Sequence, residues 1–234
     1  MFFNNDKIEF IIEPELHEVL PEPVPANKHI PEWFRKIPLK TEQRTNTMPG
    51  ATAKKCLPML DAMTLGYIVP LQGDVHVITN DDCSVLSAEH MQDSTLPFVE
   101  RHSFSQLKST GWKTGKQDPL KFINYYGIKT PPGWSCLFQP LPSVWNLPYT
   151  VLSGVVDTDQ YHSPVNFPVI WHQPNFDDTL LAGMPLVHVV PFKRQKHKHI
   201  IRPMNEKECK QRDKLNVANR TRLGTYTKEL REIR

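Results

Sequence analysis

The sequence predicts a mainly β protein, a barrel or sandwich of short strands with an extended segment at each end. Three observations lead to this fold class: 22 prolines against only 10 glycines in 234 residues, a series of strand-like segments, and turn residues between them. Prolines divide a chain into short extended pieces and interrupt long helices. Short strands separated by turns are typical of all-β barrels and sandwiches, so an all-helical bundle is excluded.

The first 54 residues are expected to form a proline-rich N-terminal arm. Residues 7–12 (KIEFII) predict a short strand, and the prolines that follow favour extended, polyproline-like backbone. Trp33 and Phe34 are large apolar side chains that would be poorly placed in a free tail. We therefore expect them to anchor the arm on a surface, either the protein's own core or a neighbouring subunit.

Residues 55–193 are expected to form the β domain. A short helix is predicted within residues 54–67, because apolar residues recur on one face and Gly66 ends it. Residues 67–79 predict a strand, a Gly-Asp turn and a second, half-buried strand in which apolar and polar side chains alternate. Further strand candidates lie at residues 83–86, 96–100, 121–130, 134–141, 149–157, 167–174 and 179–193.

The C-terminal tail, residues 194–234, is expected to be basic and partly helical from Met204. Residues 191–234 hold 14 Lys/Arg against 5 Asp/Glu, a net charge of +9, whereas the rest of the chain holds 14 against 20, a net charge of −6. Such a tail can contact nucleic acid or an acidic partner. Acids interleave with the bases and few aromatic residues are present for stacking, so a weak nucleic-acid contact or a solvated segment is expected. The basic residues of interest are Lys193, Arg194, Lys196, Lys198 and Arg202.

The cysteines and the hydropathy pattern restrict the environment of the chain. The four cysteines show no C-x-x-C spacing, which indicates reduced thiols, and Cys136 is expected in the core. The N-terminus has no signal-peptide pattern, and no stretch approaches the roughly 18 apolar residues of a membrane span. A soluble protein of a reducing cytoplasm, without membrane contact, is therefore predicted.

The main candidate site lies in residues 152–164 (LSGVVDTDQYHSP). An apolar pair leads directly into Asp157 and Asp159, with Tyr161 two positions further on. Acids in this position form a turn at the end of a strand, or one of them acts as a general base. The residue types favour the turn, and both interpretations stay open.

Three histidines were weighed as metal ligands. His197 and His199 have the spacing that places two imidazoles on one face of a strand, and His188 lies upstream. Neighbouring lysines would repel a cation, and no third ligand is evident. No metal site is therefore predicted.

The order of segments from residue 128 to residue 193 resembles that of the dUTPase and dCTP deaminase superfamily, whose members have a β-clip fold and usually form trimers. Residues 154–157 (GVVD) are similar to the family's acid segment, and residues 182–190 (AGMPLVHVV) to a later strand. The resemblance implies a β-clip domain in which Asp157 activates water or orders the deoxyribose. Tyr161, one position later than the family's tyrosine, would share that pocket, and Mg²⁺ would bridge the phosphates.

Other segments depart from that family. Residues 64–71 (TLGYIVPL) resemble its first motif with Ile68 in place of an aspartate, and residues 138–143 (FQPLPS) replace its arginine-serine motif. The tail has no glycine-rich arm that could close over a nucleotide. The family's fold segments are thus better matched than its catalytic ones.

Most of the chain also resembles an uncharacterised family common in tailed bacteriophages, marine ones especially. We therefore expect a non-enzymatic structural or assembly protein of a phage particle, such as a capsid decoration, cement, neck or tail component. Its expected partners are copies of itself and other phage structural proteins, in the virion and, during assembly, in the host cytoplasm. The alternative is a divergent deoxynucleotide triphosphate pyrophosphatase or deaminase that uses Asp157 and Mg²⁺. A nucleic-acid-associated regulator that acts through the basic tail is a third hypothesis.

Overall fold

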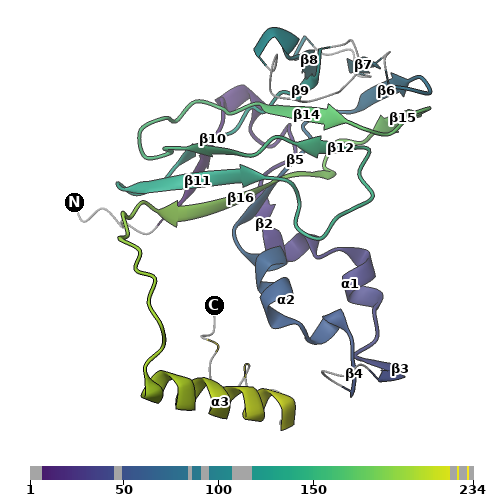
Figure 1. The fold of residues 1–234 in the computed structure, drawn as a ribbon. Helices are drawn as coiled ribbons and strands as arrows, with labels where there is room; N and C mark the ends of the chain where they lie inside the picture. The colour runs from purple at the N-terminus through teal and green to yellow at the C-terminus, as the bar shows by residue number, and fades with distance from the viewer. Residues whose placement is uncertain are drawn as a thin grey trace. The chain divides into compact units, whose positions relative to one another are not determined.

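The protein is mainly β, which confirms the predicted fold class (Figure 1). The computed structural model describes residues 7–44, 49–83, 86–90, 95–106, 118–221, 226 and 231. Within them the strands pair antiparallel, in sheets of five, four, three and two strands. The chain divides into two compact units, Met1–Pro31 with Ala62–Arg194, and Glu32–Asp61 with Gln195–Arg234.

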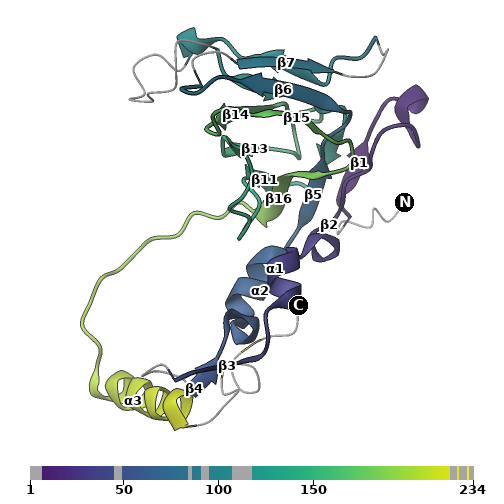
Figure 2. The same cartoon turned by 90° about the vertical axis from the view of Figure 1, so that its right-hand side faces the viewer.

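The first unit contains most of the strands, stacked in layers (Figures 1 and 2). The five-stranded sheet has the order β13 (Gly154–Val156), β11 (Trp134–Gln139), β16 (Pro185–Lys193), β5 (Tyr67–Pro70) and β2 (Val24–Pro25). The four-stranded sheet has the order β12 (Tyr149–Val151), β14 (Phe167–Trp171), β9 (Leu120–Phe122) and β8 (Val99–Arg101). The three-stranded sheet has the order β15 (Asp177–Leu180), β6 (Val75–Thr79) and β7 (Leu86–His90), and a separate pair joins β1 (Glu9–Ile11) to β10 (Gly127–Lys129).

Alternating side chains explain how these strands form one core. In β6, Val75 and Val77 are fully buried while Ile78 is 43% exposed, as the two-residue period of a half-buried strand requires. The inward residues of several sheets meet in a single cluster. Its fully buried members include Val69, Val75, Phe122, Cys136, Val169 and Val187, so the prediction that Cys136 is a core thiol is confirmed.

Most predicted strands are present, but two of them pair differently from a simple hairpin. Strands β5 and β6 flank the predicted Gly-Asp turn, yet β5 pairs with β16 and β2, whereas β6 pairs with β15 and β7. The turn therefore carries the chain from one sheet to another. The candidate at residues 83–86 lies partly outside the described residues, and β7 begins at Leu86.

The N-terminal segment contributes strands to the first unit. Strand β1 pairs with β10 and β2 pairs with β5, and the Phe10 ring packs edge-on against Tyr67, with 5.1 Å between centroids. Residues 1–31 are thus grouped with the predicted β domain, whereas residues 32–61 join the tail from residue 195. This division differs from the three predicted parts, because backbone pairing over long sequence separations joins β1 and β2 to strands of the first unit.

Helix α2 (Leu57–Thr64) confirms the helix expected within residues 54–67. Gly66 follows it with a φ of +73°, a left-handed conformation that glycine adopts without steric cost. A Cβ atom at this position would stand 2.2 Å from the carbonyl oxygen of Val189. Both the conformation and the close backbone approach therefore require glycine here.

The second unit begins with a short helix that a lysine stabilises at its C-terminal end. Helix α1 (Glu32–Lys36) buries Phe34, which is 3% exposed. Lys54 Nζ donates hydrogen bonds to the carbonyl oxygens of Phe34 (2.6 Å) and Arg35 (2.8 Å), and it lies 5.2 Å from the centroid of the Phe34 ring. A cation at this position satisfies carbonyl groups that the helix leaves free. Strands β3 (Lys40–Arg44) and β4 (Pro49–Ala51) also belong to this unit.

Helix α3 (Glu206–Thr221) confirms the predicted tail helix and begins with a reciprocal cap. The Asn205 side chain accepts from the Glu208 backbone N–H (3.0 Å), and the Glu208 carboxylate accepts from the Asn205 N–H (2.8 Å). This capping box satisfies two donors of the first turn. Arg202 also donates to Glu208, and this hydrogen bond, followed by that from Asn205, lowers the pKa of Glu208 to about 2.

Short 3-10 helices complete the described secondary structure, at Pro14–Leu16, Ala26–His29, Ala53–Lys55 and Phe104–Gln106. None of the helices in the described part of the chain is long and apolar enough to cross a membrane.

Candidate functional site

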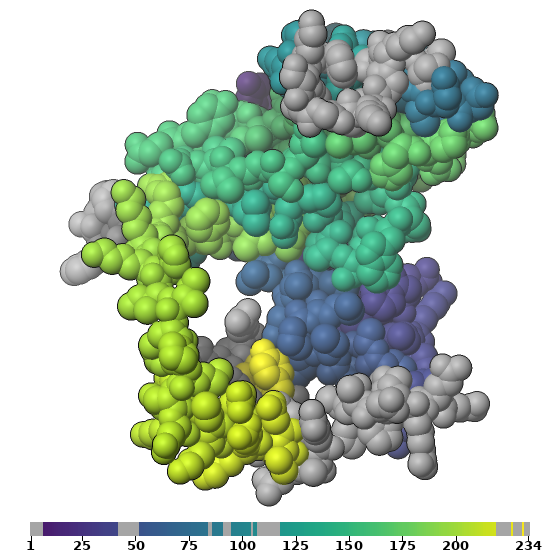
Figure 3. Space-filling model, in the orientation of Figure 1, coloured from purple at the N-terminus to yellow at the C-terminus, as the bar shows by residue number. Residues whose placement is uncertain are grey.

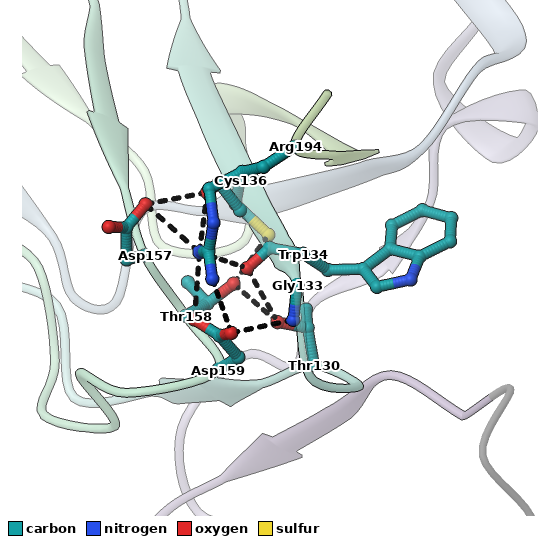
Figure 4. A network of polar contacts seen from close by, with 9 residues as sticks. Thr130, Gly133, Trp134, Cys136, Asp157, Thr158, Asp159 and Arg194 are labelled. Atoms are coloured by element: carbon teal, nitrogen blue, oxygen red, sulfur yellow. Dashed lines mark hydrogen bonds and ion pairs between the residues drawn. The ribbon is translucent and has the colours of Figure 1, made fainter. Parts of the chain in front are cut away.

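Three neighbouring strands bring the predicted acid segment to an arginine. Strand β11 lies between β13 and β16 and is antiparallel to both, so the ends of β13 and β16 meet at its start. Asp157 and Asp159 follow β13, Arg194 follows β16, and Ser135 lies near the start of β11. Figure 4 shows the side chains of Asp157, Asp159 and Arg194 converging. We call Ser135, Asp157, Asp159 and Arg194 the acid–arginine cluster.

Asp159 is the most constrained carboxylate of the cluster. Its two oxygens accept hydrogen bonds from the two terminal nitrogens of Arg194, at 2.8 and 2.5 Å, and the Gly133 N–H donates to it at 2.7 Å. Its side chain is 3% exposed. The Arg194 hydrogen bond, assisted by the Gly133 N–H, lowers the pKa of Asp159 to about 2. A bidentate arginine pair of this kind fixes both partners in one geometry.

Asp157 faces the same arginine but remains open to water. The buried Ser135 hydroxyl donates to its Oδ1 at 2.6 Å, and Arg194 Nη1 lies 3.1 Å from the same oxygen. The same Nη1 also donates to the carbonyl oxygen of Trp134 (2.9 Å) and to Ser135 Oγ (3.0 Å). The Asp157 side chain is 60% exposed, so it lies at the rim of the cluster and Asp159 lies inside it.

The backbone of the acid segment forms a hydrogen-bonded turn. The Asp157 carbonyl oxygen accepts from the N–H groups of Gln160 (2.9 Å) and Tyr161 (2.8 Å). Thr158 is buried, and its hydroxyl lies 2.8 Å from that of Thr130. The Tyr161 side chain is 51% exposed. The segment therefore has the strand-end turn that was one of the two interpretations of its sequence.

The chemistry of the cluster is that of an internal clamp. Two carboxylates surround one guanidinium, so the group carries a net negative charge and would repel a phosphate. Arg194 directs its terminal nitrogens at protein oxygens, including those of both carboxylates. The hydrogen bonds and ion pairs of the cluster join the start of β11 to the ends of β13 and β16.

Arg194 is the residue whose role sequence reasoning missed. It was grouped with the basic tail, but it belongs to the first unit and pairs with Asp157 and Asp159. The register that sets Trp134 opposite Lys193 places Arg194 beside Gly133, and only that register could have revealed the pair. Arg202 is likewise paired, with Glu208. Of the five named tail bases, Lys193, Lys196 and Lys198 have exposed side chains without such a partner among the described residues.

The two aromatic anchors lie in the second unit. Phe34 is buried there, and its ring packs edge-on against Trp33, with 5.5 Å between centroids. Trp33 is half-buried. Within this chain, Phe34 is therefore part of the packing of its own unit.

The three histidines weighed as metal ligands have different environments. His188 is buried, with Nε2 2.5 Å from the Leu65 carbonyl oxygen and Nδ1 3.0 Å from the Gln139 amide nitrogen. Burial lowers its pKa. His197 and His199 are exposed. Among the described residues, no group of three or more His, Cys, Asp or Glu side chains could hold a metal ion.

No family model matches the sequence, and no curated protein is significantly similar to it.

Proposed function

We propose that the protein is a non-enzymatic structural or assembly protein of a bacteriophage particle, built on a β-clip-like domain. The acid–arginine cluster is the observation that carries the proposal. The residue that would serve as catalytic base, Asp157, accepts a hydrogen bond from Ser135 and faces Arg194. A group arranged in this way serves the fold at a position where a nucleotide hydrolase needs a free base.

Electrostatics favour the same conclusion. Cleaving a triphosphate requires cations that neutralise charge on the phosphate oxygens. The guanidinium of this cluster is held by Asp159 through both terminal nitrogens, and a second carboxylate stands beside it. A bound triphosphate would have to displace those carboxylates from Arg194.

The assembly role is supported by the exposed chain that follows β16. Residues 194–205 contain no helix or strand and are exposed along their length. Ile200 and Ile201 are 83% and 93% exposed, and adjacent isoleucines in water favour burial against another surface. Copies of the same chain and other structural proteins of the particle are the proposed partners, and the virion is the proposed location.

A turnover assay tests the proposal against its alternative. Release of pyrophosphate and ammonia should be measured with dUTP, dCTP and their ribonucleotide analogues in the presence of Mg²⁺. We expect no turnover from the wild type or from Asp157→Asn. Turnover that the wild type shows and the variant loses would establish a deoxynucleotide pyrophosphatase or deaminase, and the structural proposal would fail.

A second experiment addresses the particle itself. Mass spectrometry of purified phage particles should find the chain at a fixed copy number relative to the major capsid protein. Chain found only in the soluble fraction of infected cells would contradict a structural role in the virion.

A further inference from the structure

Arginines and lysines of the C-terminal segment have different surroundings. From Gln195 onward, the arginines with a described side chain each pair with a carboxylate: Arg202 with Glu208, Arg212 with Asp213 and Arg231 with Asp61, at 2.6, 2.9 and 2.6 Å. Such pairs neutralise the guanidinium charge, and that of Arg231 joins the segment to Asp61 of the same unit. They leave the arginines little part in binding an external anion.

The lysines of the same segment that the structure describes are exposed and unpaired. Five of them have no carboxylate within 4.0 Å among the described residues. Their ammonium groups are thus compensated by solvent ions, which an anionic partner can replace. We call these residues the lysine surface: Lys196, Lys198, Lys207, Lys210 and Lys214.

The lysine surface is extended along the chain. Lys207, Lys210 and Lys214 are three and four residues apart in α3, so they lie on one helix face. They border an open hollow of about 730 Å³, together with Asn205, Glu206 and Gln211. Lys196 and Lys198 belong to residues 194–205, which precede the helix and contain no helix or strand. Figure 3 shows this part of the chain in yellow-green. Positive charge is therefore spread over several sites along the chain. One acid, Glu206, borders the hollow, whereas Glu208 and Asp213 of the same helix pair with arginines.

We infer that the lysine surface binds the phosphate backbone of nucleic acid without reading its sequence. Lysine is a compact point charge suited to single phosphate contacts, and a line of such charges matches a linear polyanion. Helix α3 contains no aromatic residue that could stack on a base. The binding is thus electrostatic, and its strength depends on salt. This activity goes beyond the proposed structural role and does not involve the acid–arginine cluster.

Nucleic acid explains these features better than an anionic membrane does. A helix that lies on a membrane presents an apolar face opposite its basic one, whereas α3 is polar over most of its surface, with Val217 as its large exposed apolar side chain. Ile200 and Ile201 are the side chains that a membrane or a protein partner would use. Their replacement separates these partners from nucleic acid.

The experiment compares three variants of the full chain. Lys207→Ala/Lys210→Ala/Lys214→Ala removes the helix face. The control variant, Lys7→Ala/Lys28→Ala/Lys129→Ala, removes the same charge from exposed lysines of the first unit. The third variant replaces Ile200 and Ile201 by serine.

Binding of a short fluorescent DNA duplex of random sequence should be measured by anisotropy over a series of salt concentrations. Five phosphate contacts predict a slope of log K against log salt concentration of about −4.5. The helix-face variant should reduce the magnitude of this slope by about 3, because it removes three phosphate contacts that each contribute about 0.9. The control and the isoleucine variant should keep the slope of the wild type.

Three results would overturn the inference. The first is an equal loss of binding in the control, which would make net charge alone responsible. The second is duplex binding that is absent, or whose slope the helix-face variant leaves unchanged. The third is binding to phosphatidylserine vesicles, and not to the duplex, that is lost in the isoleucine variant. None of these results affects the turnover assay with Asp157→Asn, so the two proposals fail separately.

Discussion

Replacing Phe34 by alanine should destabilise the second unit by about 4 kcal/mol. The side chain is 3% exposed, and truncation of a buried phenylalanine costs about 3–5 kcal/mol through lost burial and the cavity left behind. The contact between Lys54 Nζ and the ring, at 5.2 Å, adds about 0.5–1 kcal/mol. Lys54 keeps its hydrogen bonds to the carbonyl oxygens of residues 34 and 35, so α1 retains its C-terminal cap. The expected loss of unfolding free energy therefore stays near the middle of the 3–5 kcal/mol range, at about 4 kcal/mol.

Hydrogen exchange measured by mass spectrometry is the appropriate assay, because the two units can open separately. A loss of about 4 kcal/mol predicts amide exchange in α1 and in Ala53–Lys55, which contacts it through Lys54, faster by roughly a factor of a thousand. Peptides from β11 and β16 are the internal control and should be unchanged. Trp33→Ala, which truncates a half-buried side chain, should cost less, about 2 kcal/mol.

The opposite pattern would refute this reasoning. Unchanged exchange in α1 and in Ala53–Lys55, together with a reduced oligomer mass, would mean that Phe34 serves a partner and not the packing of its own unit. The prediction therefore separates the two docking surfaces that the sequence left open for the N-terminal arm.

Two further predictions concern the first unit. The pKa of Asp159 falls from 3.8 in the unfolded chain to about 2 in the folded one, so its stabilisation is present above about pH 4 and is lost as the pH falls toward 2. Asp159→Asn should flatten the decrease in melting temperature over that interval, and a decrease as steep as that of the wild type would contradict the clamp. Gly66→Ala should cost about 2–4 kcal/mol in urea unfolding, from left-handed backbone and the contact with Val189. Gly133→Ala, with a φ of +82° and open space at its Cβ position, should cost only about 1–2 kcal/mol, and equal losses would show that the contact is unimportant.

The strand and helix assignments could be predicted because their signals are local. Alternation over residues 75–78 gives the buried and exposed faces of β6, and Gly66 marks the end of α2. The turn in the acid segment could also be predicted, because aspartates that follow an apolar pair at the end of a strand favour a turn, and a turn forms at Asp157. The position of this turn could thus be predicted from the sequence.

The mainly β class, most strand positions, the helices α2 and α3 and the turn at Asp157 all follow from local sequence patterns. These features depend on backbone preferences and side-chain periods within a few residues. Two features required the folded chain: Arg194, 60 residues after Trp134, faces two aspartates, and the N-terminal segment is divided between two units. Strand register and the pairing of distant charges depend on which surfaces pack together, and that information is shared among segments far apart in the chain.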